Sequence, residues 1–210
     1  YARCLQLLSQ YSPLESIECL MTLPQKHVRS ALTAQCMGKA YIDSNDYTAA
    51  VMAYRQMRSF EPHRVQGSEY YSTALWHLKR EKELASLGHS VYSTDKYSAE
   101  CYVVMGNLFS LLRDTEVALK YFNRAITLAP CMSYAYTLAG YEYMHTDQLD
   151  SAIHHFHLAL LYNSRHYNAL YGLGSVAYRQ ERYEVAEAYF HRAREINTRS
   201  SVLDCYYGKL

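Results

Sequence analysis

The sequence predicts an all-α solenoid of about six stacked helix pairs. One observation is that a small residue returns at the same place in a frame that advances by about 34 residues, without a single insertion. The positions concerned hold Gly38, Ser72, Gly106, Gly140, Gly174 and Gly208. A second observation is that apolar residues around these positions recur with the three-and-four spacing of amphipathic helices.

The frame is clearest in residues 102–130, YVVMGNLFSLLRDTEVALKYFNRAITLAP. This stretch contains an aromatic residue, a large-small pair, a second aromatic, an alanine, a third aromatic, another alanine and a closing proline. These are Tyr102, Met105-Gly106, Phe109, Ala118, Phe122, Ala125 and Pro130. Their order resembles that of tetratricopeptide repeats. The resemblance implies a right-handed superhelical solenoid, in which the first helix of each pair lines the concave face.

Residues 1–30 predict a degenerate helix pair. Residues 1–10 form the end of one helix, and a second helix opens at Ser12-Pro13, where Ser12 can cap it and Glu15 completes a capping box. Pro24 ends that helix.

Five repeats and the start of another follow. We expect repeats at 31–64, 65–98, 99–132, 133–166 and 167–200, and a further one beginning at 201–210, so that 1–210 is a single solenoid. Asp46 and Asp114 are placed to cap the second helices of their repeats. Repeat 65–98 is atypical, because Tyr71-Ser72 replaces the large-glycine pair and Leu84 replaces an alanine.

Composition narrows the class of function. The net charge is +1 with acids and bases interspersed, which argues against nucleic-acid and membrane partners. The six cysteines show no CxxC spacing and are typical of reduced thiols in an intracellular protein. Because the chain opens on Tyr1 rather than Met, we expect it to be a fragment of a longer protein.

The first helices predict a peptide-binding groove. Positions two, five, nine and twelve of each repeat form one stripe on the side opposite the core-facing positions. Together with His77, which follows the stripe, the candidate lining is Glu69, Trp76, Glu100, Asn107, Tyr134, Tyr141, Asn168, Tyr171 and Tyr178. Aromatic rings and amides suit an extended peptide. The alternatives are that such residues are merely solvated and that Trp76 packs between repeats.

No catalytic or metal chemistry is predicted, and no cofactor. His154, His155 and His157 lie on a second helix, where His155 points away from the other two, and no cysteine or acid stands at ligand spacing beside them. Nucleophile-elbow and phosphate-loop motifs are absent. We therefore expect a protein that is not an enzyme.

Three stretches carry a closer resemblance. They are EYYSTALWHLKREKELASLG (69–88), SYAYTLAGYEYMHTDQLDSAI (133–153) and the segment from Ser164 to Leu203. They resemble the C-terminal repeats of the cell-division-cycle scaffold family, the third subunit of the anaphase-promoting complex. The resemblance covers nearly the whole chain, and the YSTALWHL unit is its most specific part. One departure is Leu170, where the family tends to show a tryptophan.

This resemblance implies a non-catalytic scaffold of a ubiquitin ligase in nucleus and cytoplasm. Its groove would bind the C-terminal Ile-Arg tails of activator proteins. The scaffold would also contact other subunits of the complex. The family also forms homodimers through N-terminal repeats, which we expect to be missing from this chain.

An Ile-Arg terminus needs an apolar socket, an acid and donors for its carboxylate. The corresponding hypothesis is a socket of Tyr134, Tyr141 and Tyr171, with Glu69 or Glu100 pairing the arginine. Asn107 and Asn168 would hold the backbone or the carboxylate, with His77 nearby. Two rivals stay open: a sibling repeat subunit of the same complex, and a co-chaperone-type module that binds acidic C-termini. The second would need several basic residues in the stripe, where only Lys39 is present.

Overall fold

The computed structural model describes residues 1–198, apart from the side chains of residues 25 and 26. All regular structure in this range is helical, which confirms the predicted fold class. None of the described helices is long and apolar enough to cross a membrane. The predicted start of a further repeat, 201–210, lies outside the described residues.

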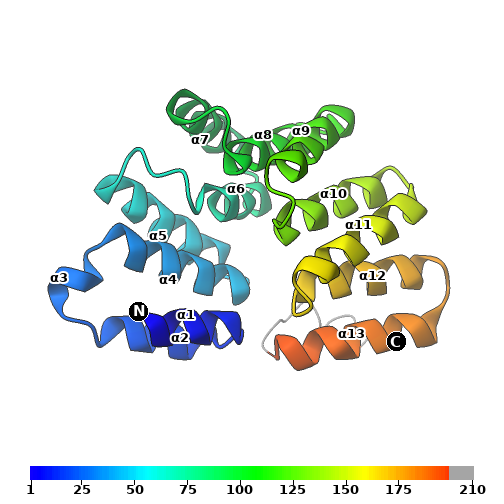
Figure 1. Ribbon diagram of the computed structural model, residues 1–210, viewed down its shortest axis with the longest axis horizontal. Coiled ribbons are helices and arrows are strands. Elements are labelled where there is room, and N and C mark those ends of the chain that lie inside the picture. The colour runs from blue at the N-terminus through cyan, green and yellow to red at the C-terminus, as the bar shows by residue number, and fades with distance from the viewer. Residues whose placement is uncertain (199–210) are drawn as a thin grey trace. The chain divides into compact units, whose positions relative to one another are not determined.

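The chain divides into two compact units, with the boundary between Leu112 and Arg113 (Figure 1). This boundary falls inside the predicted repeat 99–132, so the first helix of that repeat belongs to the first unit and its second helix to the second. The single array over the whole chain therefore stays a prediction.

The first unit contains a short helix pair, a one-turn helix, the regular pair α4–α5, the atypical pair α6–α7 and a final first helix. Their bounds are α1 Ala2–Ser9, α2 Pro13–Met21, α3 Gln25–Val28, α4 Ala31–Asp43, α5 Tyr47–Phe60, α6 Ser68–His77, α7 Glu81–Thr94 and α8 Ala99–Leu111. Helices α1 and α2 lie within the range of the predicted degenerate pair, 1–30. The sequence did not predict α3.

The second unit starts with a second helix and continues with two full pairs. Its helices are α9 Thr115–Leu128, α10 Ser133–His145, α11 Leu149–Tyr162, α12 Tyr167–Arg179 and α13 Tyr183–Ile196. The last two pairs lie within the ranges of the predicted repeats 133–166 and 167–200, whose bounds stay predictions.

The turns between the two helices of a pair share one backbone form. Each contains a left-handed residue that is not glycine, and these residues recur at intervals of 34: Tyr11, Asn45, Lys79, Arg113, Asp147 and Glu181. In the α4–α5 turn the Asp46 N–H donates to the Tyr41 carbonyl at 2.9 Å, and the same bond recurs at Ser12, Arg80, Gln148 and Arg182. This is the Schellman motif, which satisfies carbonyls that the end of a helix leaves open.

Side-chain caps follow the turns in only some pairs. The Asp46 carboxylate accepts the Ala49 N–H at 2.9 Å, and the Asp114 carboxylate accepts the Val117 N–H at 3.2 Å. Both predicted caps are confirmed. The capping box predicted at Ser12 is wrong, because the Ser12 side chain makes no capping hydrogen bond and Pro13 alone marks the start of α2.

The glycines of the frame make room for aromatic rings. A Cβ on Gly38 would stand 2.7 Å from the ring of Tyr54, and one on Gly174 would stand 2.6 Å from the ring of Phe190. Phe156 is enclosed on two sides, since a Cβ would come within 2.6 Å of it at Gly140 and 2.4 Å at Gly172. Only glycine lets the two helices approach this closely.

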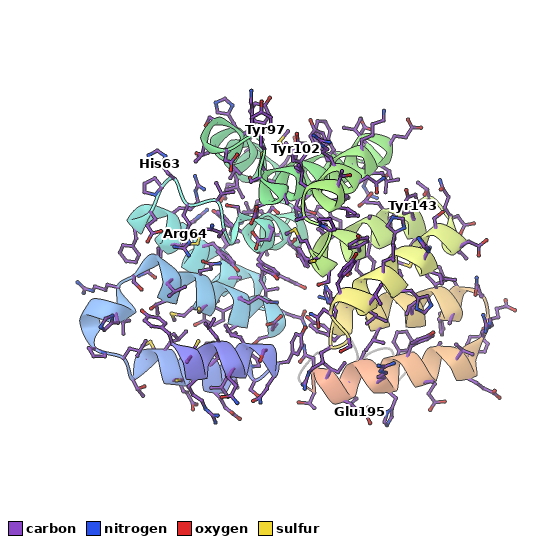
Figure 2. All side chains as sticks on the ribbon, viewed as in Figure 1. His63, Arg64, Tyr97, Tyr102, Tyr143 and Glu195 are labelled. Atoms are coloured by element: carbon purple, nitrogen blue, oxygen red, sulfur yellow. The ribbon has the colours of Figure 1, made fainter. Side chains whose placement is uncertain are left out.

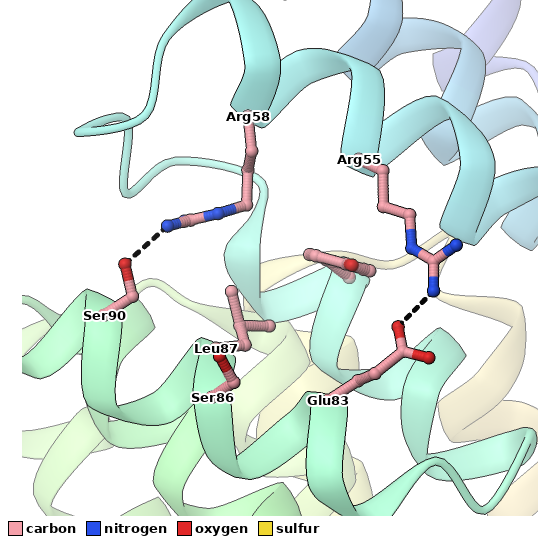
Figure 3. A pocket seen from close by; sticks show the side chains of 7 residues that line it. Arg55, Arg58, Glu83, Ser86, Leu87 and Ser90 are labelled. Carbon is pink, nitrogen blue, oxygen red and sulfur yellow. Dashed lines mark hydrogen bonds and ion pairs between the residues drawn. The ribbon is translucent and has the colours of Figure 1, made fainter.

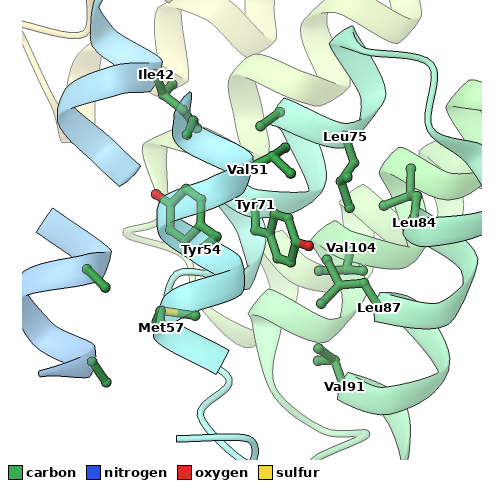
Figure 4. Close-up of a cluster of buried hydrophobic side chains, with 14 of the residues drawn as sticks. Ile42, Val51, Tyr54, Met57, Tyr71, Leu75, Leu84, Leu87, Val91 and Val104 are labelled. Atoms are coloured by element: carbon green, nitrogen blue, oxygen red, sulfur yellow. The ribbon is translucent and has the colours of Figure 1, made fainter. Parts of the chain in front are cut away.

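The core of the first unit is built around Tyr54, Tyr71 and Leu75 (Figure 4). The Tyr54 and Tyr71 rings stack with centroids 5.6 Å apart. In the atypical pair α6–α7 the glycine position is Ser72, and the ring position, 34 residues after Tyr54, is Gly88. The atypical pair therefore lacks the ring-and-glycine contact of the regular pairs.

Candidate functional site

The predicted lining falls into two sets, one in each unit. Glu69, Trp76, His77, Glu100 and Asn107 lie on α6 and α8 of the first unit. Tyr134, Tyr141, Asn168, Tyr171 and Tyr178 lie on α10 and α12 of the second unit. Each set is brought together on neighbouring first helices within its own unit.

Glu69 is a buried acid at the start of α6, with 8% of its surface exposed. Its carboxylate accepts the Gly67 N–H at 2.9 Å. Gly67 has φ of +91°, a conformation that favours glycine, and it ends the loop that leads into α6. This loop lets α6 begin at Ser68, three residues after the predicted start of the repeat at 65, and it fixes the orientation of the carboxylate.

Burial raises the pKa of Glu69 to about 7, because the charged form loses its hydration. Repulsion from Glu100 raises this pKa further, while the Gly67 N–H and the charge of Lys39 lower it. Glu100 itself is half-buried on α8. The two acids proposed as alternatives for one arginine are thus close enough to influence each other.

Lys39, which the sequence analysis did not select, acts on Glu69 through its charge. We call Glu69, Glu100, Asp43 and Lys39 the acidic cluster. The Lys39 ammonium donates to the Asp43 carboxylate at 2.8 Å and lies 4.5 Å from the centre of the Tyr70 ring. Burial raises the pKa of Asp43, and the charge of Lys39 opposes that rise. The four-residue spacing of Lys39 and Asp43 on a helix was the sequence signal that could have identified the pair.

Asn107 is buried in the contact between α6 and α8, with 3% of its surface exposed. Its amide nitrogen donates to the Ser72 hydroxyl at 2.7 Å and to the Thr73 hydroxyl at 3.0 Å. Both amide hydrogens are therefore engaged within the first unit. A role in holding a peptide stays a prediction, and it requires the carbonyl oxygen or a rearranged amide.

Trp76 lies at the α6–α8 contact as well. Its indole N–H donates to the Ser110 hydroxyl at 3.1 Å, and the Lys79 ammonium lies 3.8 Å from the centre of its ring. Packing between repeats, the alternative for Trp76, agrees with these contacts. His77 stacks on Tyr47 with centroids 4.0 Å apart, and burial of the ring lowers the pKa of His77.

The set in the second unit is mainly aromatic. The Tyr141 hydroxyl donates to the Asn168 carbonyl at 2.8 Å, and this bond ties α10 to α12. Tyr171 packs against Phe190 and Tyr178 against Tyr183, with centroids 5.7 and 5.5 Å apart. Tyr134 is buried and stacks on His166. Tyr141, Asn168, Tyr171 and Tyr178 are partly exposed and could contact a ligand.

The stripe is more buried than its spacing suggested. Glu69, Asn107 and Tyr134 each expose less than a tenth of their surface, and Val103 exposes none. The reason is that consecutive first helices pack on each other, as α6 does on α8 and α10 on α12. Side chains on this face therefore reach the neighbouring first helix.

Of the three histidines of α11, His155 is partly buried and packed, whereas His154 and His157 are exposed. The His155 ring lies 4.8 Å from that of Tyr143, which Figure 2 labels, and its Nδ1 lies 2.8 Å from the Ser151 carbonyl. Burial lowers the pKa of His155. Within residues 1–198 no group of three histidine, cysteine or acidic side chains is arranged to hold a metal ion.

Comparison with known proteins agrees with the geometry of the helix pairs. Models described as tetratricopeptide repeat match residues 99–130 and 137–200. The chain is 37% identical over 210 residues, its whole length, to "Anaphase-promoting complex subunit 3" of Schizosaccharomyces pombe. It is 39% identical over 194 residues, 92% of its length, to "Cell division cycle protein 27 homolog B" of Arabidopsis thaliana. The chain is a tetratricopeptide-repeat homologue of the APC3/Cdc27 subunits.

This APC3/Cdc27 homologue spans 32% of the fission yeast relative and 26% of the plant relative. The matched region is the C-terminal part of those proteins. A thermophilic tetratricopeptide protein of Thermus thermophilus has a similar solved structure, with a TM-score of 0.70, 16% identity and coverage of 85% of this chain and 97% of that one. At that identity the likeness supports the fold alone.

Proposed function

We propose that the chain is part of a non-catalytic scaffold subunit of an anaphase-promoting complex. In this proposal its first helices bind the C-terminal Ile-Arg tails of activator proteins. The homology to APC3/Cdc27 subunits over the whole chain carries the proposal. Association with other subunits of the complex, and residence in nucleus and cytoplasm, belong to the same proposal.

The acidic cluster of the first unit supports the arginine part of this function. Glu69 and Glu100 supply two carboxylates, against the one ammonium of Lys39, which is already paired with Asp43. A guanidinium arriving beside Glu69 would favour its charged form and lower its pKa, because opposite charges stabilise each other. Binding would therefore release a proton from Glu69 near neutral pH.

The partly exposed tyrosines of the second unit are, taken within that unit alone, suited to an apolar side chain. Tyr141 and Tyr171 present rings whose orientations are fixed by a hydrogen bond and by packing on Phe190. Rings that are already fixed lose little conformational entropy when a ligand binds. They are suited to an isoleucine side chain, whose affinity comes from buried apolar area.

A fluorescence titration of the chain with a labelled peptide ending in Ile-Arg tests the proposal. Three comparison peptides make the test more specific: one has an amidated end, one has citrulline in place of arginine, and one has an acidic C-terminus. We expect the first two changes to weaken binding by roughly tenfold or more, since each removes a charged hydrogen-bonding group. Equal binding of the free and amidated ends contradicts the proposal, and preference for the acidic peptide favours a co-chaperone-type module.

Variants assign the residues. Glu69→Gln keeps the shape of the side chain and removes its charge. It should therefore weaken binding of the Ile-Arg peptide and leave binding of the citrulline peptide unchanged. In the unmodified chain, affinity should rise as the pH increases through about 7, and Glu69→Gln should flatten this rise. Glu187→Gln, at an exposed position of α13, is the matched control. Unchanged binding by Asn107→Ala, in a variant that retains its circular dichroism spectrum, removes Asn107 from the site.

A further inference from the structure

A second polar site lies away from the predicted groove. A pocket of about 310 Å³ is bordered by α5, α6 and α7 of the first unit (Figure 3). It is lined by Arg55, Arg58, Tyr71, Glu83, Ser86, Leu87 and Ser90. None of these residues belongs to the candidate lining of the first helices. The pocket combines two guanidinium groups, three hydroxyl groups and one carboxylate.

Arg58 is the cation of this pocket that no acid neutralises. It is half-buried and donates to the Ser90 hydroxyl at 2.6 Å, and no salt bridge to it is found within the described residues. Burial lowers the pKa of Arg58, because its charge loses hydration without gaining a carboxylate. An anion placed here would form charge-assisted hydrogen bonds that the Ser90 hydroxyl cannot replace.

Arg55 is held at the rim of the pocket. Its guanidinium pairs with the Glu83 carboxylate at 2.5 Å and is hydrogen-bonded to the Tyr71 hydroxyl. Both partners of the Arg55–Glu83 pair are partly exposed, at 52% and 37%. Surface pairs of this kind are weak, so a competing anion can take the place of Glu83 at little cost.

The lining of the pocket includes a position at which repeat 65–98 departs from the regular pattern. At the frame position of Tyr71 the other described repeats carry Met37, Met105, Ala139 and Leu173, none of which offers a hydroxyl. At the position of Leu87 the preceding repeat carries Ala53, and the three repeats that follow carry the rings of Tyr121, His155 and Tyr189. The Tyr71 hydroxyl therefore gives the pocket a polar wall that the other described repeats lack at this frame position.

We propose that this pocket binds the oxyanion of an acidic side chain, carboxylate or phosphoryl, presented by a partner polypeptide. The two guanidinium groups and the hydroxyl groups of Ser86, Ser90 and Tyr71 are donors for its oxygens. Leu87 and the Tyr71 ring contact the aliphatic part of the same side chain. A single carboxylate at the rim and a chain charge of +1 disfavour a polyanion such as nucleic acid, which needs a run of cations.

The test uses three small probes and the full chain. N-acetyl-phosphoserine amide, N-acetyl-glutamate amide and N-acetyl-serine amide are titrated at low salt, and binding is followed by NMR of the arginine side-chain N–H groups. We expect saturable binding of the first, the second or both, with a dissociation constant on the order of millimolar for so small a ligand. N-acetyl-serine amide should give no saturable shift. The stronger of the two acidic probes identifies the oxyanion.

Three variants separate this site from general surface charge. Arg58→Gln should weaken binding of the acidic probes by roughly tenfold or more, since it removes a charged hydrogen-bond donor. Glu83→Gln should strengthen binding of the acidic probes, because it frees Arg55 and removes a charge that repels them. Arg124→Gln, an exposed arginine on α9 of the second unit, is the control and should change nothing. If Arg58→Gln does not fold, Arg58→Lys keeps the charge, loses the planar fork and should bind with intermediate affinity.

Two results overturn the proposal. One is an equal response to Arg58→Gln and Arg124→Gln, which means that the probes sense only net charge. The other is weaker binding in Glu83→Gln, which means that Arg55 does not take part. The inference does not depend on the Ile-Arg function, since none of the probes ends in arginine.

Discussion

The second unit and the atypical helix pair of the first unit fill equivalent space in opposite ways. In the second unit Phe156 lies between Gly140 and Gly172, so close that a methyl group on either would overlap the ring. In the pair α6–α7 the position of Gly140 holds Ser72 and the ring position of Phe156 holds Gly88, so no ring fills this space. The regular pair is held together by an apolar contact between a ring and glycine. The atypical pair instead brings Ser72 to Asn107 and opens the pocket beside Tyr71.

This contrast indicates which helix pairs of a repeat array can carry polar binding sites. Regular repeats devote the frame positions to packing, and any polar group there would lack a partner. The atypical pair gives up one ring and gains hydrogen bonds to the next first helix. Both candidate polar sites of the first unit, the acidic cluster at Glu69 and the arginine pocket, include residues of this pair.

The first prediction concerns the glycines, and its effect is comparable in size to that of the second. Gly172→Ala should destabilise the chain by roughly 2–3 kcal/mol, because its Cβ would meet the Phe156 ring at 2.4 Å. Gly88→Ala is the comparison change at the ring position of the atypical pair, where the nearest atom is the flexible Met105 sulfur at 3.2 Å. It should be neutral, or stabilising by up to about 1 kcal/mol through helix propensity. Urea unfolding measures both, and equal destabilisation would remove the distinction between the two regions.

A second prediction concerns the pH dependence of stability in the first unit. Burial raises the pKa of Glu69 from 4.5 to about 7, so the folded chain holds a proton that the unfolded chain has released between these values. The stability that Glu69 provides is complete below about pH 4.5 and decreases as the pH rises to about 7. By linkage the loss is on the order of 3 kcal/mol.

Thermal unfolding between pH 4.5 and 8 measures this dependence. Glu69→Gln mimics the protonated form and should reduce the slope of stability against pH across that window. Glu187→Gln, at an exposed site of the second unit, should leave the slope unchanged. A slope that Glu69→Gln does not alter would show that another group titrates there.

The smallest effect concerns the helix caps. Asp114→Ala should cost about 1 kcal/mol, because the Val117 N–H loses its acceptor. Ser12→Ala should have almost no effect, since that side chain makes no capping bond. Amide hydrogen exchange in the first turns of α9 and α2 distinguishes the two. Faster exchange in both variants would mean that Ser12 caps α2 in solution.

The sequence predicted the frame more completely than the site. The recurrence of Gly38, Gly140 and Gly174 predicted the frame, and the structure places each of them against an aromatic ring of the paired helix. The burial of Asn107 and Glu69 was not predicted, because spacing places a residue on a face without showing which helix covers that face. The arginine pocket was missed for a related reason. Its residues come from three helices, and neither Arg58 nor Ser90 matches any motif.

The left-handed turns set the register of the chain. Six of them recur at the same interval, and each starts the second helix after the same number of residues. An insertion of one residue in such a turn would rotate the following helix by about 100° and direct its inward-facing ring toward solvent. These short connections are therefore the positions at which the chain should tolerate length variation least. The loop from 61 to 67, which already departs from the regular length, should tolerate it better.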